Sequence, residues 1–261
     1  MFALGCALKF PKALLFMSYC VGMLLDRGIV MVADSRTNAG VDNISTFRKV
    51  TVFQKSRDRV FVLMTSGNLA ASQAVVNILR EAIADPEPGR PNLFDAATMF
   101  EAARCVGDAI RQVHGRDAEG MKDFGLEFNV TFLLGGQIAG ESLRLFNIYP
   151  ASNFIEATAD TTYFQIGEFK YGKPILDRVI TRECSLEEAA KCALISMDST
   201  IRSNLSVGLP IDLIIIRNGE LRVGHHRVID ADDPYFHQIR RGWGEALRNA
   251  FKGLPDPDLS P

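Results

Sequence analysis

The segment 19–34 constrains the fold more strongly than any other part of the sequence. It consists of two apolar runs, "YCVGMLLD" and "GIVMVAD", which meet at the turn signal Asp26-Arg27-Gly28. A short polar turn between two strand-like runs predicts a β-hairpin. Apolar residues occur at both alternating positions of each run, as in sheets that are covered on both faces. We therefore expect this hairpin to lie inside a layered structure.

Strand-like runs and amphipathic helices alternate along the rest of the chain. The expected strands and hairpins lie at 19–34, 47–54, 59–65, 128–137, 140–150, 162–167 and 211–229. The expected helices lie at 66–84, 92–113, 171–180, 185–204 and about 234–252. Ser185 and Glu188 form the signature of a capping box, and 114–127 is expected to be a polar loop. This order predicts an α+β fold, a four-layer αββα sandwich in which helices cover two sheets.

Residues 18–252 are interpreted as one domain, because no linker or repeat interrupts them. The apolar segment 1–17 is interpreted as a leader, or as a mis-assigned N-terminal extension with Met17 as the true start. A signal peptide is the alternative, although two lysines and a proline interrupt the apolar run and no small-residue cleavage site precedes Ser18. The segment 253–261 is expected to be a flexible tail.

The composition argues against several classes of function. A net charge of −2 provides no attraction to nucleic acid or to an anionic membrane. The five cysteines include no Cys-x-x-Cys pair, which indicates reduced thiols in a cytoplasmic protein. His225 and His226 are adjacent, and adjacent strand residues point to opposite faces, so we expect no metal site. After residue 17, no apolar run is long enough to span a bilayer, and we expect no cofactor.

Five separated segments resemble proteasome-type β subunits. The first, "SYCVGMLLDRGIVMVADSRTNAG", is similar to the segment that carries that family's nucleophile and, sixteen residues later, its aspartate. The others, in order, are "STFRKV", "MTSGNLA", "QIGEFKYGKPILDR" and "SNLSVGLPIDL". Within this resemblance, which covers 18–229, "TNAGVDNISTFRKV" and "YGKPILDR" are most similar to the bacterial proteasome-related Anbu family, also called bacterial proteasome homologue.

The resemblance implies an N-terminal nucleophile (Ntn) hydrolase fold and a catalytic site. By this resemblance Ser18 is the nucleophile, and Asp34 and Lys49 form a charge pair beneath its hydroxyl. Gly67 corresponds to the glycine whose N–H binds the oxyanion. Ser206 corresponds to a further serine of the site.

The chemistry expected of Ser18 depends on its position in the chain. A serine hydroxyl is a weak nucleophile and needs a base. The α-amine of an N-terminal residue, with a pKa of about 7.7–8.0, can be that base, whereas the nitrogen of a peptide bond cannot. Activity therefore requires removal of residues 1–17, or translation from Met17 followed by loss of that methionine. Cys20 shares a strand face with Ser18 and is interpreted as a packed thiol rather than a rival nucleophile.

Two positions depart from the pattern of proteasome subunits. Glu168 and Phe169 occupy the place of a serine that supports the terminal amine. Further on, Ser203 stands where an aspartate is expected, and Asn204 or Asp198 is the candidate replacement. These departures bear directly on whether the α-amine is held as a base.

Three functions are open at this point. The first is an amide hydrolase, expected to be a peptidase, that forms an acyl-enzyme on Ser18 with a peptide or amide substrate. The second is a catalytically silent structural or binding subunit in which residues 1–17 persist. The third is a small-amide acylase. The resemblance also implies self-association into a ring or an open spiral, with the helix at 234–252 as a candidate subunit contact, and it identifies no ATPase partner.

Overall fold

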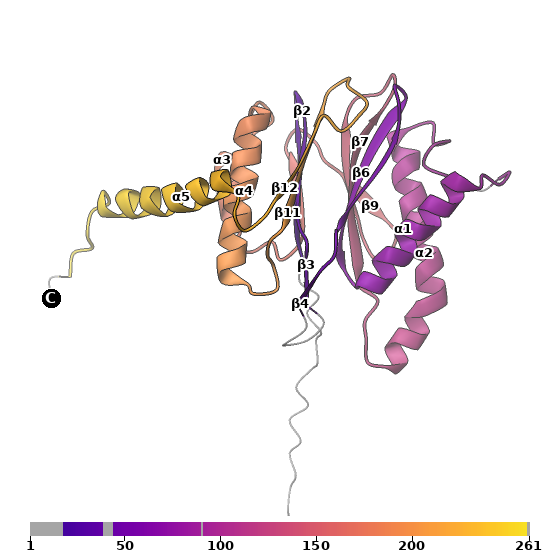
Figure 1. The fold of residues 1–261 in the computed structure, drawn as a ribbon, viewed down its shortest axis with the longest axis horizontal. Coiled ribbons are helices and arrows are strands. Elements are labelled where there is room, and N and C mark those ends of the chain that lie inside the picture. Colours follow the sequence, from indigo (N-terminus) through magenta and orange to yellow (C-terminus); the bar gives the residue numbers. More distant parts are fainter. Residues whose placement is uncertain (1–17, 39–43, 90, 260–261) are drawn as a thin grey trace, which may run out of the picture.

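Two five-stranded antiparallel sheets face each other in the computed structural model, which describes residues 18–38, 44–89 and 91–259 (Figure 1). Helices lie on the outer face of each sheet. The mixed α and β structure predicted from the sequence is therefore confirmed. The expected leader, 1–17, lies outside the described residues.

The first sheet contains the predicted hairpin and has the order β10-β1-β2-β11-β12. Its strands are β1 (Tyr19–Leu25), β2 (Gly28–Asp34), β10 (Tyr163–Gly167), β11 (Ile211–Arg217) and β12 (His225–Ile229). Every residue of β1 and β2 is buried. The register pairs Cys20 with Ala33, and the exposed turn Asp26-Arg27 joins the two strands. The hairpin predicted at 19–34 is confirmed.

The second sheet has the order β5-β6-β7-β8-β9. Its strands are β5 (Val50–Lys55), β6 (Arg59–Gly67), β7 (Val130–Ile138), β8 (Arg144–Ile148) and β9 (Phe154–Glu156). A separate two-stranded sheet joins β3 (Arg36–Asn38) and β4 (Ile44–Thr46). The periodicity of the sequence does not predict β3, β4 or β9, because three residues are too few to show it.

Three apolar clusters hold these layers together. One lies between the sheets and joins Cys20 and Met31 of the first sheet to Met64 and Leu133 of the second. The other two lie between each sheet and its helices. Because both faces of each sheet are covered, the strands read as continuous apolar runs rather than as alternating ones.

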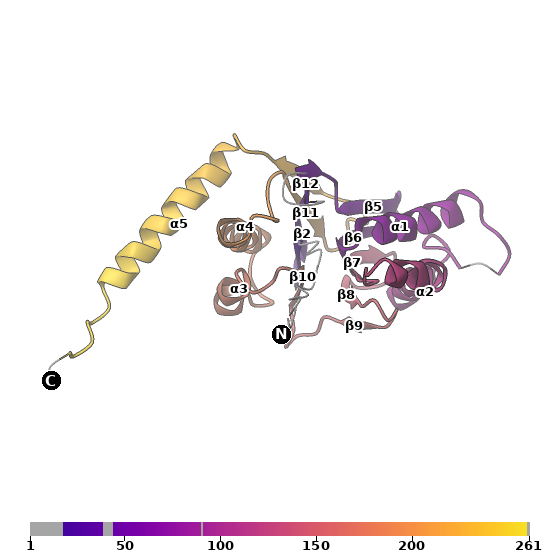
Figure 2. The same ribbon diagram turned by 90° about the horizontal axis from the view of Figure 1, so that it is seen from below.

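The covering helices form two pairs. α1 (Leu69–Ala84) and α2 (Met99–Asp123) pack on the second sheet, and α3 (Lys173–Val179) and α4 (Leu186–Ser203) pack on the first (Figures 1 and 2). The predicted capping box is present at the start of α4. The hydroxyl of Ser185 accepts from the N–H of Glu188, and the Glu188 carboxylate accepts from the N–H of Ser185.

The prediction for α2 is wrong at both ends. The helix starts at Met99 rather than near 92, because the hydroxyl of Thr98 accepts from the N–H of Glu101 and caps it there. It then continues to Asp123, through residues expected to form a loop. The side chains of 114–123 are at least partly exposed, so this extension forms without the apolar stripe that reveals a packed helix.

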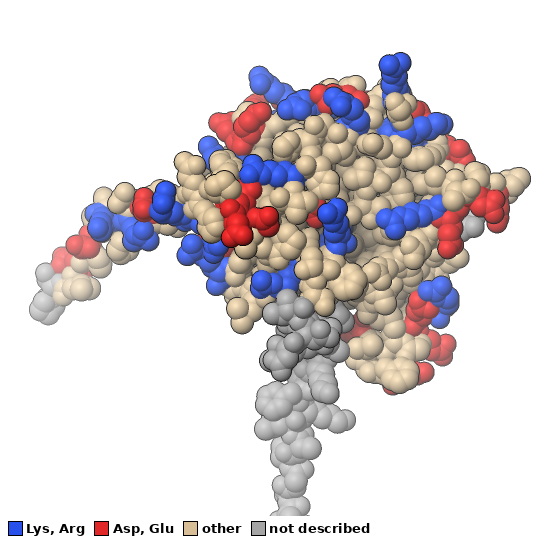
Figure 3. Space-filling view, in the orientation of Figure 1, with Lys and Arg blue, Asp and Glu red and all other residues tan. Residues whose placement is uncertain are grey.

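The last helix, α5 (Pro234–Lys252), projects away from the layers (Figures 1 and 2). Phe236 is its one buried residue, so only its first turns are anchored. Its charged side chains are mostly basic, with Arg240, Arg241, Arg248 and Lys252 against the single acidic residue Glu245 (Figure 3). Among the described residues, no helix combines the length and the apolar character needed to cross a bilayer.

Candidate active site

The carboxylate of Asp34 lies at the centre of the candidate active site. Asp34 ends β2 and is fully buried. Its Oδ1 accepts hydrogen bonds from the backbone N–H of Tyr19 at 2.9 Å and from Nζ of Lys49 at 2.5 Å. Its Oδ2 accepts from the N–H of Gly208 at 3.3 Å. One side chain therefore joins the first strand, the segment before β5 and the loop before β11.

Asp34 and Lys49 form a buried ion pair. Burial raises the pKa of the Asp34 carboxyl, while the Lys49 ammonium and the two backbone donors oppose that rise. Lys49 is only 5 % exposed and also donates to the carbonyl of Arg36 at 2.7 Å. A buried pair offsets its desolvation only when further hydrogen bonds satisfy both partners, and both partners have them here.

Ser18 lies immediately before β1, one residue ahead of the N–H that Asp34 binds, and is 6 % exposed. Its carbonyl accepts from the N–H of Glu168 at 2.7 Å. The N–H of the following residue, Tyr19, is the group that Asp34 binds. The backbone of Ser18 is therefore held on both sides, one peptide unit from the Asp34 carboxylate.

The close approach of β10 to Ser18 depends on a glycine. Gly167 has a φ of +82°, and a Cβ at this position would lie 1.8 Å from the carbonyl oxygen of Ser18. Only glycine combines that backbone conformation with that contact. Gly167 thereby allows the next residue, Glu168, to bind the Ser18 carbonyl.

The end of β6 reaches the same site. The N–H of Thr65 donates to the carbonyl of Lys49 at 3.1 Å, and the thiol of Cys20 donates to the carbonyl of Thr65 at 3.6 Å. Burial raises the pKa of the Cys20 thiol, which suits a packed neutral thiol. Gly67 follows two residues later with a φ of +102°, and a Cβ there would lie 2.1 Å from the carbonyl oxygen of Asn129. The contact with Asn129 therefore accounts for glycine at this position.

The loop after α4 links the predicted Ser206 to the neighbourhood of Ser18. Oδ1 of Asn204 accepts from the N–H of Ser206 at 2.8 Å, and Nδ2 of Asn204 donates to Oε2 of Glu168 at 3.0 Å. Glu168 is 5 % exposed, and Nζ of Lys170 lies 3.6 Å from its other oxygen. Of the two candidate replacements for the missing aspartate, Asn204 is therefore the one beside Glu168.

Asp198, the other candidate, has different partners. Its carboxylate pairs with Arg202 at 2.9 Å and with Arg240 of α5 at 2.6 Å. It therefore anchors α5 to α4.

A buried polar network behind Ser18 is not visible in the sequence. The hydroxyl of Tyr19 lies 2.6 Å from Oγ of Ser196, and Nε2 of Gln165 donates to the same hydroxyl at 2.5 Å. Burial raises the pKa of the Tyr19 phenol. These partners come from α4 and β10, far along the chain from Tyr19, so spacing carries no signal for them. The network fixes the residue that follows the candidate nucleophile.

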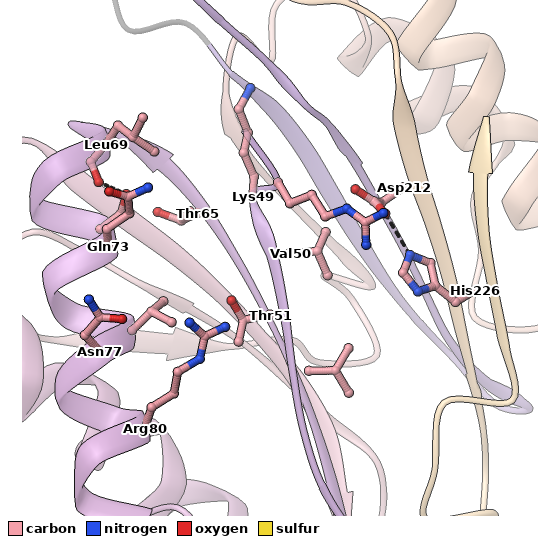
Figure 4. A pocket seen from close by; sticks show the side chains of 14 residues that line it. Lys49, Val50, Thr51, Thr65, Leu69, Gln73, Asn77, Arg80, Asp212 and His226 are labelled. Atoms are coloured by element: carbon pink, nitrogen blue, oxygen red, sulfur yellow. Dashed lines mark hydrogen bonds and ion pairs between the residues drawn. The ribbon is translucent and has the colours of Figure 1, made fainter. Parts of the chain in front are cut away.

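A cavity of about 630 Å³ opens beside Lys49 (Figure 4). Its volume falls in the range of small-molecule sites, roughly 300–1,000 Å³. The residues that line it are Arg48, Lys49, Val50, Thr51, Val52, Thr65, Leu69, Ser72, Gln73, Val76, Asn77, Arg80, Asp212 and His226. Asp212 accepts from the hydroxyl of Ser35 at 3.2 Å, and its other oxygen lies 2.7 Å from Nε2 of His226.

Within the described residues, no group of three or more histidine, cysteine, aspartate or glutamate side chains could hold a metal ion.

The chain is similar to several solved structures. A structure described as Anbu, an ancestral beta-subunit, from Yersinia bercovieri shares 52 % identity at a TM-score of 0.87, over 93 % of this chain and 100 % of that chain. Anbu from Hyphomicrobium sp. strain MC1 shares 50 % identity at a TM-score of 0.87, over 92 % and 100 % of the two chains. A helical assembly of the Anbu complex from Pseudomonas aeruginosa shares 44 % identity at a TM-score of 0.87, over 92 % and 98 %. No protein-family model and no curated protein matches the chain.

Replacing Gly167 with alanine is expected to destabilise the protein and displace Ser18. The control is Gly140→Ala, because Gly140 also has a positive φ, +86°, but has no atom within 4 Å of its Cβ position. Both variants lose about 1 kcal/mol from the backbone conformation, and Gly167→Ala loses roughly 1–3 kcal/mol more from the clash. Urea denaturation measures the difference. Equal losses in the two variants would show that the contact with Ser18 does not constrain Gly167.

Asp34→Asn is expected to lower the free energy of unfolding by about 3–5 kcal/mol, because it leaves the Lys49 ammonium buried without a counter-ion. The double variant Asp34→Asn/Lys49→Met removes both charges and should recover most of that loss. Denaturant unfolding of the three proteins gives the comparison. A single variant as stable as the parent would contradict the role assigned to the ion pair.

Proposed function

The chain belongs to the Anbu family, a proteasome-related bacterial family, and on that basis we propose that it is an Ntn amide hydrolase that cleaves peptide bonds through Ser18. The layers of helices and sheets are, in this proposal, the four-layer αββα sandwich of such hydrolases. The observation that carries the proposal is the bonding of Asp34 Oδ1, which accepts both from Lys49 and from the N–H that follows Ser18.

The proposed reaction begins when Ser18 is the first residue of the chain. Its α-amine takes the proton of its own hydroxyl, and Oγ attacks the carbonyl carbon of the substrate. The positive charge of Lys49 favours the alkoxide, and Asp34 holds Lys49 in place. The N–H of Gly67 donates to the oxyanion, a contribution of about 2.7–4 kcal/mol for one such donor.

Collapse of the tetrahedral intermediate completes the first half of the reaction. The α-ammonium gives its proton to the departing amine, and the acyl group stays on Oγ of Ser18. A water molecule, deprotonated by the same α-amine, then attacks the ester and releases the carboxylic acid. In the first half of the reaction the α-amine passes its proton to the departing amine, and in the second half it returns its proton to Oγ of Ser18.

Glu168 and Asn204 take the part of the amine-supporting serine and aspartate in this proposal. The N–H of Glu168 binds the Ser18 carbonyl, and its carboxylate binds Asn204, which in turn holds Ser206. A carboxylate near an ammonium stabilises the protonated form. We therefore expect this site to work best at a more alkaline pH than a site with a neutral serine in the place of Glu168.

Self-association is the second part of the proposal. The structure from Pseudomonas aeruginosa is described as a helical assembly, and α5 gives this chain a surface for a similar contact. Its apolar stripe starts at the buried Phe236 and continues through Trp243 to Leu247 and Phe251, which are 50 % and 76 % exposed. The stripe is buried at the start of α5 and exposed near its C-terminal end. We propose that a second copy of the chain binds this exposed part in a ring or an open spiral.

The site of action is proposed to be the cytoplasm. The cysteines of the described residues, Cys20, Cys105, Cys184 and Cys192, are all free thiols. Free thiols persist in reducing compartments.

A peptide that carries an electrophilic carbonyl is expected to label the protein on Ser18. Intact mass should show a chain that begins at Ser18 and gains one probe. Ser18→Ala should lose the label and lower peptide hydrolysis at least about a thousandfold. Cys20→Ala, which removes the neighbouring thiol, should keep both.

Three results would contradict the proposal, because each would favour another function or another nucleophile. Residues 1–17 retained on every subunit would favour the silent structural subunit. Labelling that persists in Ser18→Ala would place the nucleophile elsewhere. Cleavage of small amides but not of peptides would favour the acylase.

Replacing Leu247 and Phe251 together with serine is expected to disrupt assembly, because it removes the exposed part of the apolar stripe. The control replaces Glu245 and Asn249 with serine, since these exposed residues have the same spacing on a different side of α5. Sedimentation velocity should show smaller particles for the first pair and parent-like particles for the second. If the variant with Leu247 and Phe251 replaced forms assemblies of the same size as the parent, α5 does not make this contact.

A further inference from the structure

The cavity beside Lys49 consists of two parts, one on each side of β5. Successive side chains of a strand point to opposite faces, so within β5 Thr51 faces one part while Val50 faces the other. In Figure 4, the side chains of α1 lie on one side of β5, and Asp212 and His226 lie on the other. The part between β5 and α1 is called the α1 groove below.

The α1 groove runs along one face of a helix. Leu69, Gln73, Asn77 and Arg80 line it from α1, and their spacing of four, four and three residues places them on one side of about three helical turns. In Figure 4, Lys49 lies at one end of the groove and Arg80 at the other. The groove therefore leads from Lys49, the partner of Asp34, to a cation on α1.

The charge of the groove is not balanced. Lys49 is paired with Asp34, whereas Arg80 forms no ion pair with any residue that the structure describes. The only acidic residue among those that line the cavity is Asp212, which lies across β5 and is bonded to Ser35 and His226. Arg80 is therefore left as a net positive charge at the far end of the groove.

A second polar group in the groove has no partner. Oγ1 of Thr65 is buried, and no described residue is hydrogen-bonded to it. A buried hydroxyl without a partner costs free energy, and this one lines the cavity beside Lys49. Gln73 and Asn77 add exposed amide groups that can donate hydrogen bonds along the same path. These groups together suit a ligand with several oxygen atoms and a negative end.

We propose that the α1 groove selects substrates with an acidic side chain on the acyl side of the scissile bond, and that Arg80 is the specificity-determining residue. The carboxylate pairs with the Arg80 guanidinium, which binds carboxylates in a two-pronged geometry. This inference rests on the proposed hydrolase function and names its substrate class.

The test uses acetyl-dipeptidyl aminomethylcoumarin substrates that differ only in the residue before the coumarin, which is Glu, Gln, Asp or Lys. The parent protein should cleave the Glu substrate with a kcat/KM about tenfold above that of the Gln substrate, the ratio expected for one hydrogen-bonded charge pair. Arg80→Gln should remove this preference, and Arg80→Glu should shift it toward Lys. The control is Arg48→Gln, which removes an arginine that lines the cavity from outside α1 and should keep the preference.

A binding measurement separates failure of this inference from failure of the proposed function. The same four peptides, with fluorescein in place of the acetyl group, are titrated against Ser18→Ala and Ser18→Ala/Arg80→Gln, which need no turnover. Tighter binding of the Glu peptide that is lost with Arg80 supports the inference even if no peptide is cleaved. Equal binding or equal cleavage of the Glu and Gln peptides by proteins that retain Arg80 would overturn it. A preference that persists in Arg80→Gln would also overturn it.

Discussion

The buried ion pair between Asp34 and Lys49 is the interaction on which the rest of the site depends. Apolar contacts hold the two sheets together over most of their facing area, but apolar packing is not directional. The Asp34 carboxylate adds direction, because it binds a backbone donor of β1, a side chain beside β5 and a backbone donor of the loop before β11. The relative placement of these three segments therefore follows from one charged group.

The parts of the fold that the sequence predicts are those with strong local signals. The hairpin at 19–34 has two long apolar runs and a polar turn, and α4 has a capping box that needs only Ser185 and Glu188. The end of α2 and the three-residue strands are not predicted. In α2 the segment 114–123 is solvated rather than packed, so it lacks the apolar periodicity on which such a prediction depends.

In the candidate site, too, some residues are predicted from the sequence, whereas contacts between segments that are distant in sequence are not. Ser18, Asp34 and Lys49 are predicted from the resemblance to proteasome β subunits, and in the structure Asp34 binds Lys49 and the N–H of the residue that follows Ser18. The contact of Asn204 with Glu168, and the partners of the Tyr19 hydroxyl, join segments that are distant in sequence. The unpartnered hydroxyl of Thr65 is likewise a property of three-dimensional surroundings. No linear pattern encodes these features, because each depends on how one element packs on another.

Under the proposed function, the hydrogen bond between Tyr19 and Asp34 has a consequence for the timing of maturation. The N–H involved belongs to the residue after Ser18, so it is the same group before and after residues 1–17 are lost. The bond, and with it the ion pair, exists in a chain that still carries those residues. Cleavage before Ser18 would then release an amine into surroundings that are already assembled. In the proposed hydrolase, such a chain would be a latent precursor, which cleavage of the peptide bond before Ser18 would activate.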